Sequence, residues 1–177
     1  MTGFEDLKDD LPWAEPREAE EVAEHTHSDM RGQITDPIKV VGAILAGNAT
    51  LTVVSKKTGN RLTFKFSRPP LEQGRKRPVW VKVLSGADNE GDYTFLGTIW
   101  PEAQGWNYNH KRGGAVTHDA PSAKLIQWML KQININPSAL VAQAEIWHEG
   151  RCLRCGRKLT VPSSIESGYG PECVKLA

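Results

Sequence analysis

Residues 51–66, with the sequence LTVVSKKTGNRLTFKF, decide the fold. In the first part, Leu51 and Val53 alternate with Thr52 and Val54. In the second, apolar side chains alternate with polar ones, in the order Arg61, Leu62, Thr63, Phe64, Lys65, Phe66. Such alternation is typical of half-buried strands, and the Lys-Thr-Gly-Asn at 57–60 is typical of a turn. This stretch predicts two antiparallel strands joined by a short connection.

Two further strands are predicted on the C-terminal side of this pair. Val79, Val81 and Val83 alternate with other residues, and residues 93–100 form another strand-like run after the turn at 86–92. The prolines of residues 68–78 exclude a central strand and indicate a basic loop. A sheet of about four strands with a covering helix is enough for an independent core.

Helices are predicted on both sides of this meander. Asp36 can cap a helix over 37–46 that ends at Gly47, although the β-branched residues there also allow a strand. A second helix, capped by Asp119 or Ser122, has its apolar positions on one face: Leu125, Ile126, Met129, Leu130 and Ile133. Residues 101–119 indicate a loop, and residues 140–147 a strand or a short helix. The fold class is therefore α+β, a small antiparallel sheet with two helices.

Charged residues are distributed unevenly along the 177 residues of the chain. Residues 1–30 hold ten acids and two bases, whereas residues 31–177 carry a net charge of +9. We expect a disordered acidic tail over 1–33, an α+β domain over 34–145 and a cysteine-containing module over 146–177. The longest apolar run, 40–47, is far shorter than the roughly 20 residues of a membrane span, and no secretory signal is evident. These features predict a cytoplasmic protein with no membrane partner.

The acidic tail contains a short motif, Asp9-Asp10-Leu11-Pro12-Trp13. Acids followed by a Leu-Pro-aromatic group can insert the aromatic ring into a pocket while basic residues of a partner meet the acids. The motif resembles the acidic tip of bacterial single-stranded-DNA-binding proteins, which lies at the opposite end of those chains. Asp9, Asp10, Leu11 and Trp13 are therefore candidate partner-binding residues, and a solvated tail is the alternative.

All three cysteines lie near the C-terminus, in a pattern typical of a zinc site. Cys152 and Cys155 have the C-x2-C spacing with which two thiolates grip one tetrahedral ion, and Cys173 follows at a distance found in zinc ribbons and knuckles. His148 is the only imidazole nearby and is the predicted fourth ligand of Zn²⁺. A catalytic zinc would need an open position, but neither the deaminase nor the H-E-x-x-H pattern is present.

The segment HEGRCLRCGRKLTVPSSIESGYGPEC, residues 148–173, resembles a short zinc-binding module of unassigned function found in proteins of phages and other mobile elements. This module also occurs appended to helicase-like proteins. The turn at 86–93 is similar, more weakly, to the region that often precedes it. The resemblance implies zinc, a mobile-element context and the cytoplasm of the host cell. It implies no activity.

Cations lie beside aromatic residues in several predicted loops. Phosphates bind Arg and Lys while unpaired bases stack on rings, so this pairing is typical of single-strand binders. The candidate nucleic-acid-binding residues are Arg75, Lys76, Arg77, Trp80, Lys111, Arg112, Arg154 and Arg157. The alternative is that the rings pack in the core and the cations are simply solvated.

No nucleotide-binding or hydrolase motif is present, and His110 and His118 with Asp119 are explained equally well by a polar loop. We therefore predict a non-enzyme: a zinc-containing accessory protein that binds single-stranded DNA or RNA. A protein-interaction module that inhibits or redirects a host defence or replication complex is the alternative.

Overall fold

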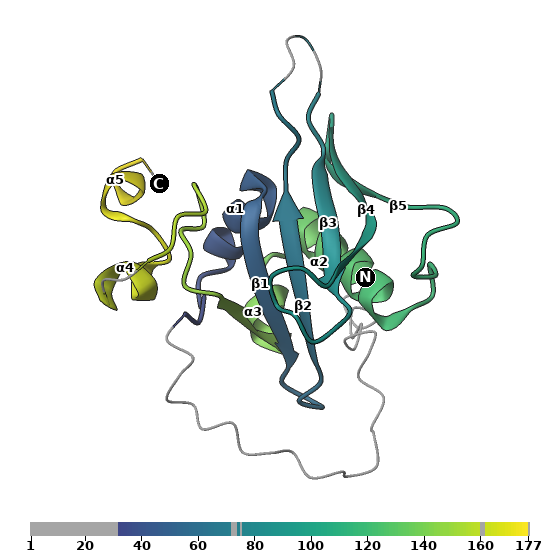
Figure 1. Ribbon diagram of the computed structural model, residues 1–177, viewed down its shortest axis with the longest axis horizontal. Helices are drawn as coiled ribbons and strands as arrows, with labels where there is room; N and C mark the ends of the chain where they lie inside the picture. Colours follow the sequence, from purple (N-terminus) through teal and green to yellow (C-terminus); the bar gives the residue numbers. More distant parts are fainter. Residues whose placement is uncertain (1–31, 72–73, 75, 160–161, 177) are drawn as a thin grey trace, which may run out of the picture.

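The computed structural model describes residues 32–71, 74, 76–159 and 162–176. Within them the chain forms five helices and one six-stranded antiparallel sheet with the strand order β5-β4-β3-β2-β1-β6 (Figure 1). The strands are β1 (Asn48–Ser55), β2 (Arg61–Ser67), β3 (Val79–Leu84), β4 (Tyr93–Glu102), β5 (Gly105–His110) and β6 (Ala144–His148). The predicted α+β class is confirmed, but the sheet is larger than the expected four strands.

Both additional strands lie at the edges of the sheet. β5 pairs with β4 inside the stretch predicted to be a loop, because its Gly and Asn residues give a weak strand signal. A side chain of the second long helix holds this edge strand in place. The Asn134 side chain accepts from the backbone N–H of Trp106 at 2.9 Å and donates to the Trp106 carbonyl at 2.8 Å. β6 pairs with β1 and closes the other edge.

The first helix, α1 (Pro37–Ala46), has both predicted ends. The Asp36 carboxylate accepts from the backbone N–H of Ile38 at 2.9 Å, and Gly47 adopts the left-handed conformation with φ 70°. A side chain at Gly47 would also collide with Arg68, whose guanidinium donates to the Leu45 carbonyl at the helix end.

The second helix, α2 (Pro121–Ile135), buries the predicted apolar face. Its N-cap is Ala120, which makes no side-chain capping bond, so the prediction of Asp119 or Ser122 as the cap is wrong. Pro121 begins the helix with a preset φ and no N–H to satisfy, and Ser122 is buried instead. Residues 140–147 contain both predicted alternatives, the end of α3 (Ser138–Gln143) followed by most of β6.

Helices α1, α2 and α3 pack against the same face of the sheet, behind it in Figure 1. The residues that β1, β2 and β3 direct toward them include Leu51, Phe64 and Val81, none of which is exposed. No helix among the described residues is long and apolar enough to cross a membrane. Two short helices, α4 (Pro162–Ser167) and α5 (Pro171–Val174), follow β6 and lie beside the sheet at the left of Figure 1.

Most of the predicted acidic tail, residues 1–31 with the Asp9–Trp13 motif, lies outside the described residues. Its last two residues are described and contact β6. The Gly32 carbonyl accepts from the backbone N–H of His148 at 2.9 Å, and Gln33 forms an isolated antiparallel bridge with Trp147. Ile34 then packs in the core with 5% of its surface exposed.

Candidate metal centre

Cys152 and Cys155 lie in a tight knuckle directly after β6. An antiparallel bridge between Arg151 and Lys158 closes the knuckle at its base. Inside it, the Cys152 N–H donates to the Arg157 carbonyl at 2.8 Å, and the Gly156 N–H donates to the Cys152 carbonyl at 2.9 Å. Gly156 has φ 74°, a conformation that strongly favours glycine, so the Cys-x-x-Cys-Gly sequence dictates this turn.

Cys173 reaches the knuckle through a return built from α4, Gly168 and α5. Gly168 has φ 79° and approaches so closely that a Cβ there would lie 2.7 Å from Leu153 Cδ1. Its carbonyl accepts from the Leu153 N–H at 2.9 Å. Gly170 is the N-cap and Pro171 the first residue of α5, which carries Cys173. These glycines therefore let the chain turn back and bring Cys173 to the knuckle.

The three sulfur atoms converge. Cys152, Cys155 and Cys173 place their Sγ atoms within 4.8 Å of one another. Cys152 is buried, Cys155 is exposed and Cys173 lies between these extremes. Sulfurs bound to one zinc ion lie about 2.3 Å from it, so neighbouring ligands of a tetrahedral site are about 4 Å apart. These three side chains could hold a metal ion.

The sulfurs do not ionise equally. Burial opposes ionisation of Cys152, but hydrogen bonds from the backbone N–H groups of Cys155, Gly170 and Arg154 outweigh it and lower its pKa to about 7. A hydrogen bond with the Cys155 thiol, together with some burial and the nearby Cys152 sulfur, raises the pKa of Cys173 to about 11. Three crowded thiols cannot readily all lose their protons without a cation among them.

The structure does not bring the predicted fourth ligand, His148, into this group. His148 Nε2 lies 2.7 Å from the Ile165 carbonyl, which can only accept, so Nε2 carries the proton. Nδ1 then accepts from the Gly150 N–H at 3.1 Å. Both ring nitrogens are thus engaged, and burial lowers the pKa of the imidazole. The ring holds α4 against the end of β6, a role that sequence proximity to the cysteines does not reveal.

Sulfur is the only donor type in the cluster that the described residues form, and three protein ligands would leave one position of a tetrahedral ion for another donor. The neighbouring Glu149 is engaged elsewhere, since its carboxylate lies 3.1 Å from Arg151 Nε. The arrangement can chemically bind a soft or borderline metal ion and fix the knuckle in shape.

The described residues among the predicted nucleic-acid-binding set lie in separate parts of the structure. Arg154 and Arg157 are exposed on the knuckle, where the Asn48 side chain donates to the Arg154 carbonyl at 2.9 Å and ties the knuckle to β1. Arg77 turns inward and donates to the Pro69 carbonyl at 2.7 Å, while Lys76 is exposed in the same loop. Arg75 lies outside the described residues. Trp80 is exposed on the sheet.

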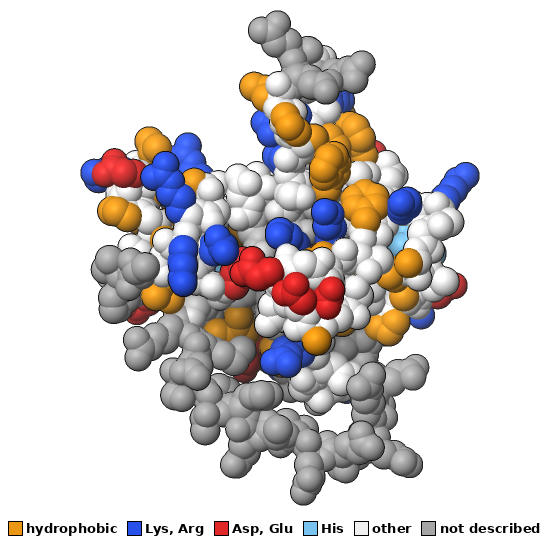
Figure 2. Space-filling view, in the orientation of Figure 1, with side chains coloured by type: hydrophobic (Ala, Val, Ile, Leu, Met, Phe, Trp, Pro, Cys, Tyr) orange, Lys and Arg blue, Asp and Glu red, His pale blue; other side chains and the backbone are white. Residues whose placement is uncertain are grey.

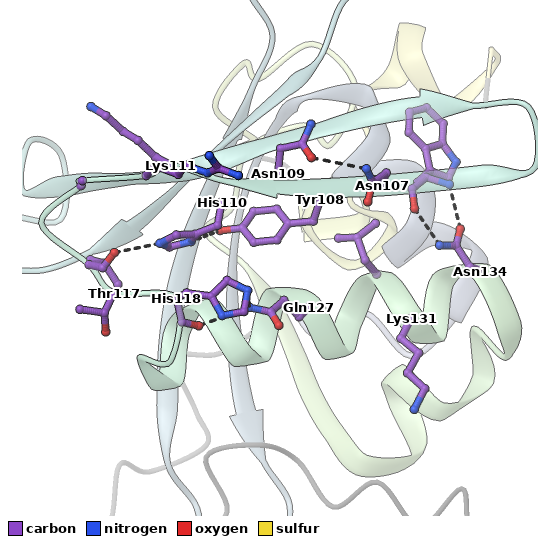
Figure 3. A pocket seen from close by; sticks show the side chains of 16 residues that line it. Asn107, Tyr108, Asn109, His110, Lys111, Thr117, His118, Gln127, Lys131 and Asn134 are labelled. Carbon is purple, nitrogen blue, oxygen red and sulfur yellow. Dashed lines mark hydrogen bonds between the residues drawn. The ribbon is translucent and has the colours of Figure 1, made fainter.

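Lys111 and Arg112 border an open cavity of about 1100 Å³ between β5, the following loop and α2 (Figure 3). His110 also lines it, but both of its nitrogens are engaged. Nε2 lies 2.9 Å from the Val116 carbonyl and Nδ1 lies 2.9 Å from the Tyr108 hydroxyl, which therefore donates. Burial raises the pKa of Tyr108 to about 12. The pair ties the loop to β5.

Sequence reasoning missed a second set of residues, on the sheet face opposite the helices. Lys65, Lys82, Tyr93 and Phe95 lie there together with Trp80. The alternation in β2 and β3 gives the outward position of the lysines. Phe95 of β4 lies opposite Lys82, because the register between β3 and β4 shifts between Val81 and Lys82.

Residues 142–176 match a protein family of unknown function, DUF6011. The matched segment contains the three cysteines and His148 and covers about a fifth of the chain. No curated protein and no solved structure matches the chain. The matched residues include the segment 148–173 whose resemblance to a zinc-binding module was noted from the sequence. Neither the match nor the resemblance indicates an activity.

Proposed function

We propose that this protein is a non-enzymatic, zinc-containing accessory protein of a phage or mobile element that binds nucleic acid. The observation that supports it most is that one turn carries two of the three clustered sulfurs and a group of exposed cations. Arg154, Arg157 and Lys158 are exposed on the knuckle that contains Cys152 and Cys155. A zinc ion would hold this turn rigid, so its cations would bind phosphates without first losing conformational freedom.

Charge supports a polyanionic partner. Residues 31–177 have a net charge of +9, which attracts polyanions before any specific contact forms. Zinc knuckles are among the modules that bind unpaired nucleic acid, and we take single-stranded DNA or RNA as the ligand. Residues 1–30, with a net charge of −8, would compete for the same surface.

The test combines metal analysis with binding. The purified protein is expected to contain one zinc per chain by mass spectrometry. Fluorescence anisotropy with labelled single-stranded DNA, single-stranded RNA and duplex DNA should show binding that weakens steeply as salt rises, because bound cations displace counterions from the phosphates. Salt-independent binding, or none to any of the three, would contradict the proposal.

A variant that lacks residues 1–30 tests whether this acidic segment blocks nucleic-acid binding by the rest of the chain. Removal of residues 1–30 leaves Gly32, Gln33 and their contacts with β6 in place. We expect tighter binding and a stronger dependence on salt. If neither form binds, capture of a host protein that survives nuclease treatment would favour the alternative function, a protein-interaction module.

A further inference from the structure

The sheet has one face without a covering helix among the described residues, and this face presents aromatic rings between lysines. The three helices that pack on the sheet do so from the other side. Side chains on the uncovered face come from β2, β3, β4 and the residue after β5 (Figure 2). They form what we call the platform, with the members Lys65, Trp80, Lys82, Tyr93, Phe95 and Lys111.

The lysines of the platform form a row across the strands. Lys65 of β2 is the register partner of Lys82 of β3, and Lys82 is in turn the partner of Phe95 of β4. Lys111 completes the row, with its Nζ 5.6 Å from the centre of the Phe95 ring. Neighbouring strands are about 4.8 Å apart, so the row extends roughly 15 Å. A row of three cations of this length can contact the phosphates of a few consecutive nucleotides.

The aromatic residues lie within and beside this row. Trp80, two residues from Lys82 along β3, is the most accessible, with 37% of its surface exposed. Phe95 lies diagonally across from it on β4, and Tyr93 lies under Lys65, whose Nζ is 5.3 Å from the ring centre. Rings on a rigid sheet present their faces at fixed positions, which is what base stacking requires.

The charge on the platform is not neutralised from within the described part of the chain. Lys65, Lys82 and Lys111 form no salt bridge with any described residue. Like charges on directly opposed strand positions destabilise a sheet, so Lys65 and Lys82 together carry a cost in stability. The acids that act on Tyr93 of the platform are Glu149, which follows β6, and Glu90 and Asp88 of the β3–β4 turn. Glu90 also lies 3.8 Å from Arg151, at the edge toward the knuckle. The platform is therefore locally basic and bordered by acids on one side.

From this arrangement we infer that the platform binds single-stranded nucleic acid, with phosphates on the lysine row and bases stacked on Trp80 and Phe95. This inference rests on the proposed function and deepens it, because it moves the main contact from the knuckle to the sheet. A duplex cannot use the rings, since its bases are already stacked on one another. A flat surface of cations alone would bind both forms.

The experiment measures anisotropy of labelled oligo(dT), oligo(U) and duplex DNA of about 20 nucleotides with the full-length, zinc-loaded chain. Lys82→Glu is compared with Lys124→Glu, which makes the same charge change on an exposed position of α2 behind the sheet. Trp80→Ala is compared with Trp80→Phe, which keeps a ring. Circular dichroism confirms that each variant is folded.

We expect Lys82→Glu to weaken single-strand binding about tenfold or more and to flatten its salt dependence, whereas Lys124→Glu changes it less than threefold. Trp80→Ala should also cost about tenfold, since removal of a stacking ring typically weakens binding that much, and Trp80→Phe should restore most of it. The duplex should be affected by Lys82→Glu only. The ratio of the oligo(dT) and oligo(U) affinities tells whether DNA or RNA is preferred.

Four outcomes would overturn the inference. If Trp80→Ala binds like the parent, or if Lys82→Glu and Lys124→Glu weaken binding equally, the platform is not the contact surface, although the proposed function stands. If Arg154→Glu with Arg157→Glu abolishes binding while both platform substitutions have no effect, the knuckle is the contact surface. If the parent protein binds none of the three probes, the proposed function fails together with the inference.

Discussion

Up to His148 the chain buries a large apolar core, whereas after it the chain buries very little. Phe64, Leu96 and Leu125 have no exposed surface, and they belong to a continuous cluster that joins the sheet to α1, α2 and α3. In the described part of residues 149–176, the only buried residues are Cys152, Leu153, Leu159 and Gly168. The helices there have six and four residues, too short to persist on their own.

The comparison shows that one chain stabilises its two regions by different means. Burial of apolar surface holds the sheet domain, at about 25 cal/mol per Å² removed from water. The cysteine segment has too little such surface, and its three converging sulfurs offer a metal bond instead. The two regions share a boundary at Leu153, which packs in the main core, and at the bond from Asn48 to the Arg154 carbonyl.

The largest expected effect comes from Cys155→Ser. Cys155 is exposed, so its replacement leaves no buried cavity and acts through the cluster of sulfurs that could hold the metal. Removal of one of three thiolates should lower metal affinity by more than the 10–100-fold typical of a lost outer-shell partner. Bound metal is measured by mass spectrometry and the amides of residues 150–176 by hydrogen exchange. We expect these amides to lose protection while those of the sheet keep it.

Lys158→Ala serves as the control on the same turn, because its side chain is exposed and is not among the clustered ligands. It should keep the metal. A Cys155→Ser protein with full metal content and unchanged exchange would mean that the segment is not held by the cysteines.

The reverse experiment disturbs the sheet domain alone. Phe64→Ala removes a completely buried ring and should lower the free energy of unfolding by about 3–5 kcal/mol. Denaturant unfolding measures the loss, and the folded variant should retain its metal. If the metal is lost from folded protein, the two regions are coupled more tightly than their contacts indicate.

A smaller effect concerns His148, which links the two regions. Burial lowers the pKa of this imidazole below its usual 6.5, so the unfolded chain takes up the proton at a higher pH than the folded one. The free energy of unfolding should therefore fall as the pH drops from 6.5 toward the lowered pKa, and it should be unaffected by this group above about pH 7.

His148→Gln is the matched variant, because an amide can still donate to the Ile165 carbonyl without titrating in this range. Its unfolding free energy should depend less on pH between 5 and 7 than that of the parent. The same variant should retain the metal, and loss of metal would instead place His148 in the coordination sphere.

The smallest effect belongs to the outer edge of the sheet. Asn134→Ala removes the two hydrogen bonds that hold the Trp106 backbone to α2 and should cost about 1 kcal/mol. Hydrogen exchange should show faster exchange at β5, with no change at β6. Equal destabilisation of both edges would indicate that the side chain supports the whole sheet.

Much of this fold follows from local patterns. The helix over 37–46 was predictable because its cap, its apolar spacing and its terminating glycine all act within a few residues. The turn with Cys152 and Cys155 was predictable for the same reason, since a C-x2-C-Gly turn leaves few conformations open, and Cys173 was predictable from its spacing to this pair. The strand at 105–110 was not, because its pairing with β4 and the bond to Asn134 come from residues that its own sequence does not contain.

By itself, the sequence determined the alternating strands, the two longer helices and the approach of three cysteines. The strands and helices depend on dihedral preferences and side-chain spacing within about a dozen residues. The approach of Cys173, 18 residues after Cys155, depends on Gly168 and Gly170, where the chain turns back. Only the tertiary structure decided that His148 binds the Ile165 carbonyl and that Phe95 turns outward among lysines. The reason is that both features depend on the packing of helices and strands that are distant in sequence. That packing selects the hydrogen-bond partner of a side chain and the register between two strands.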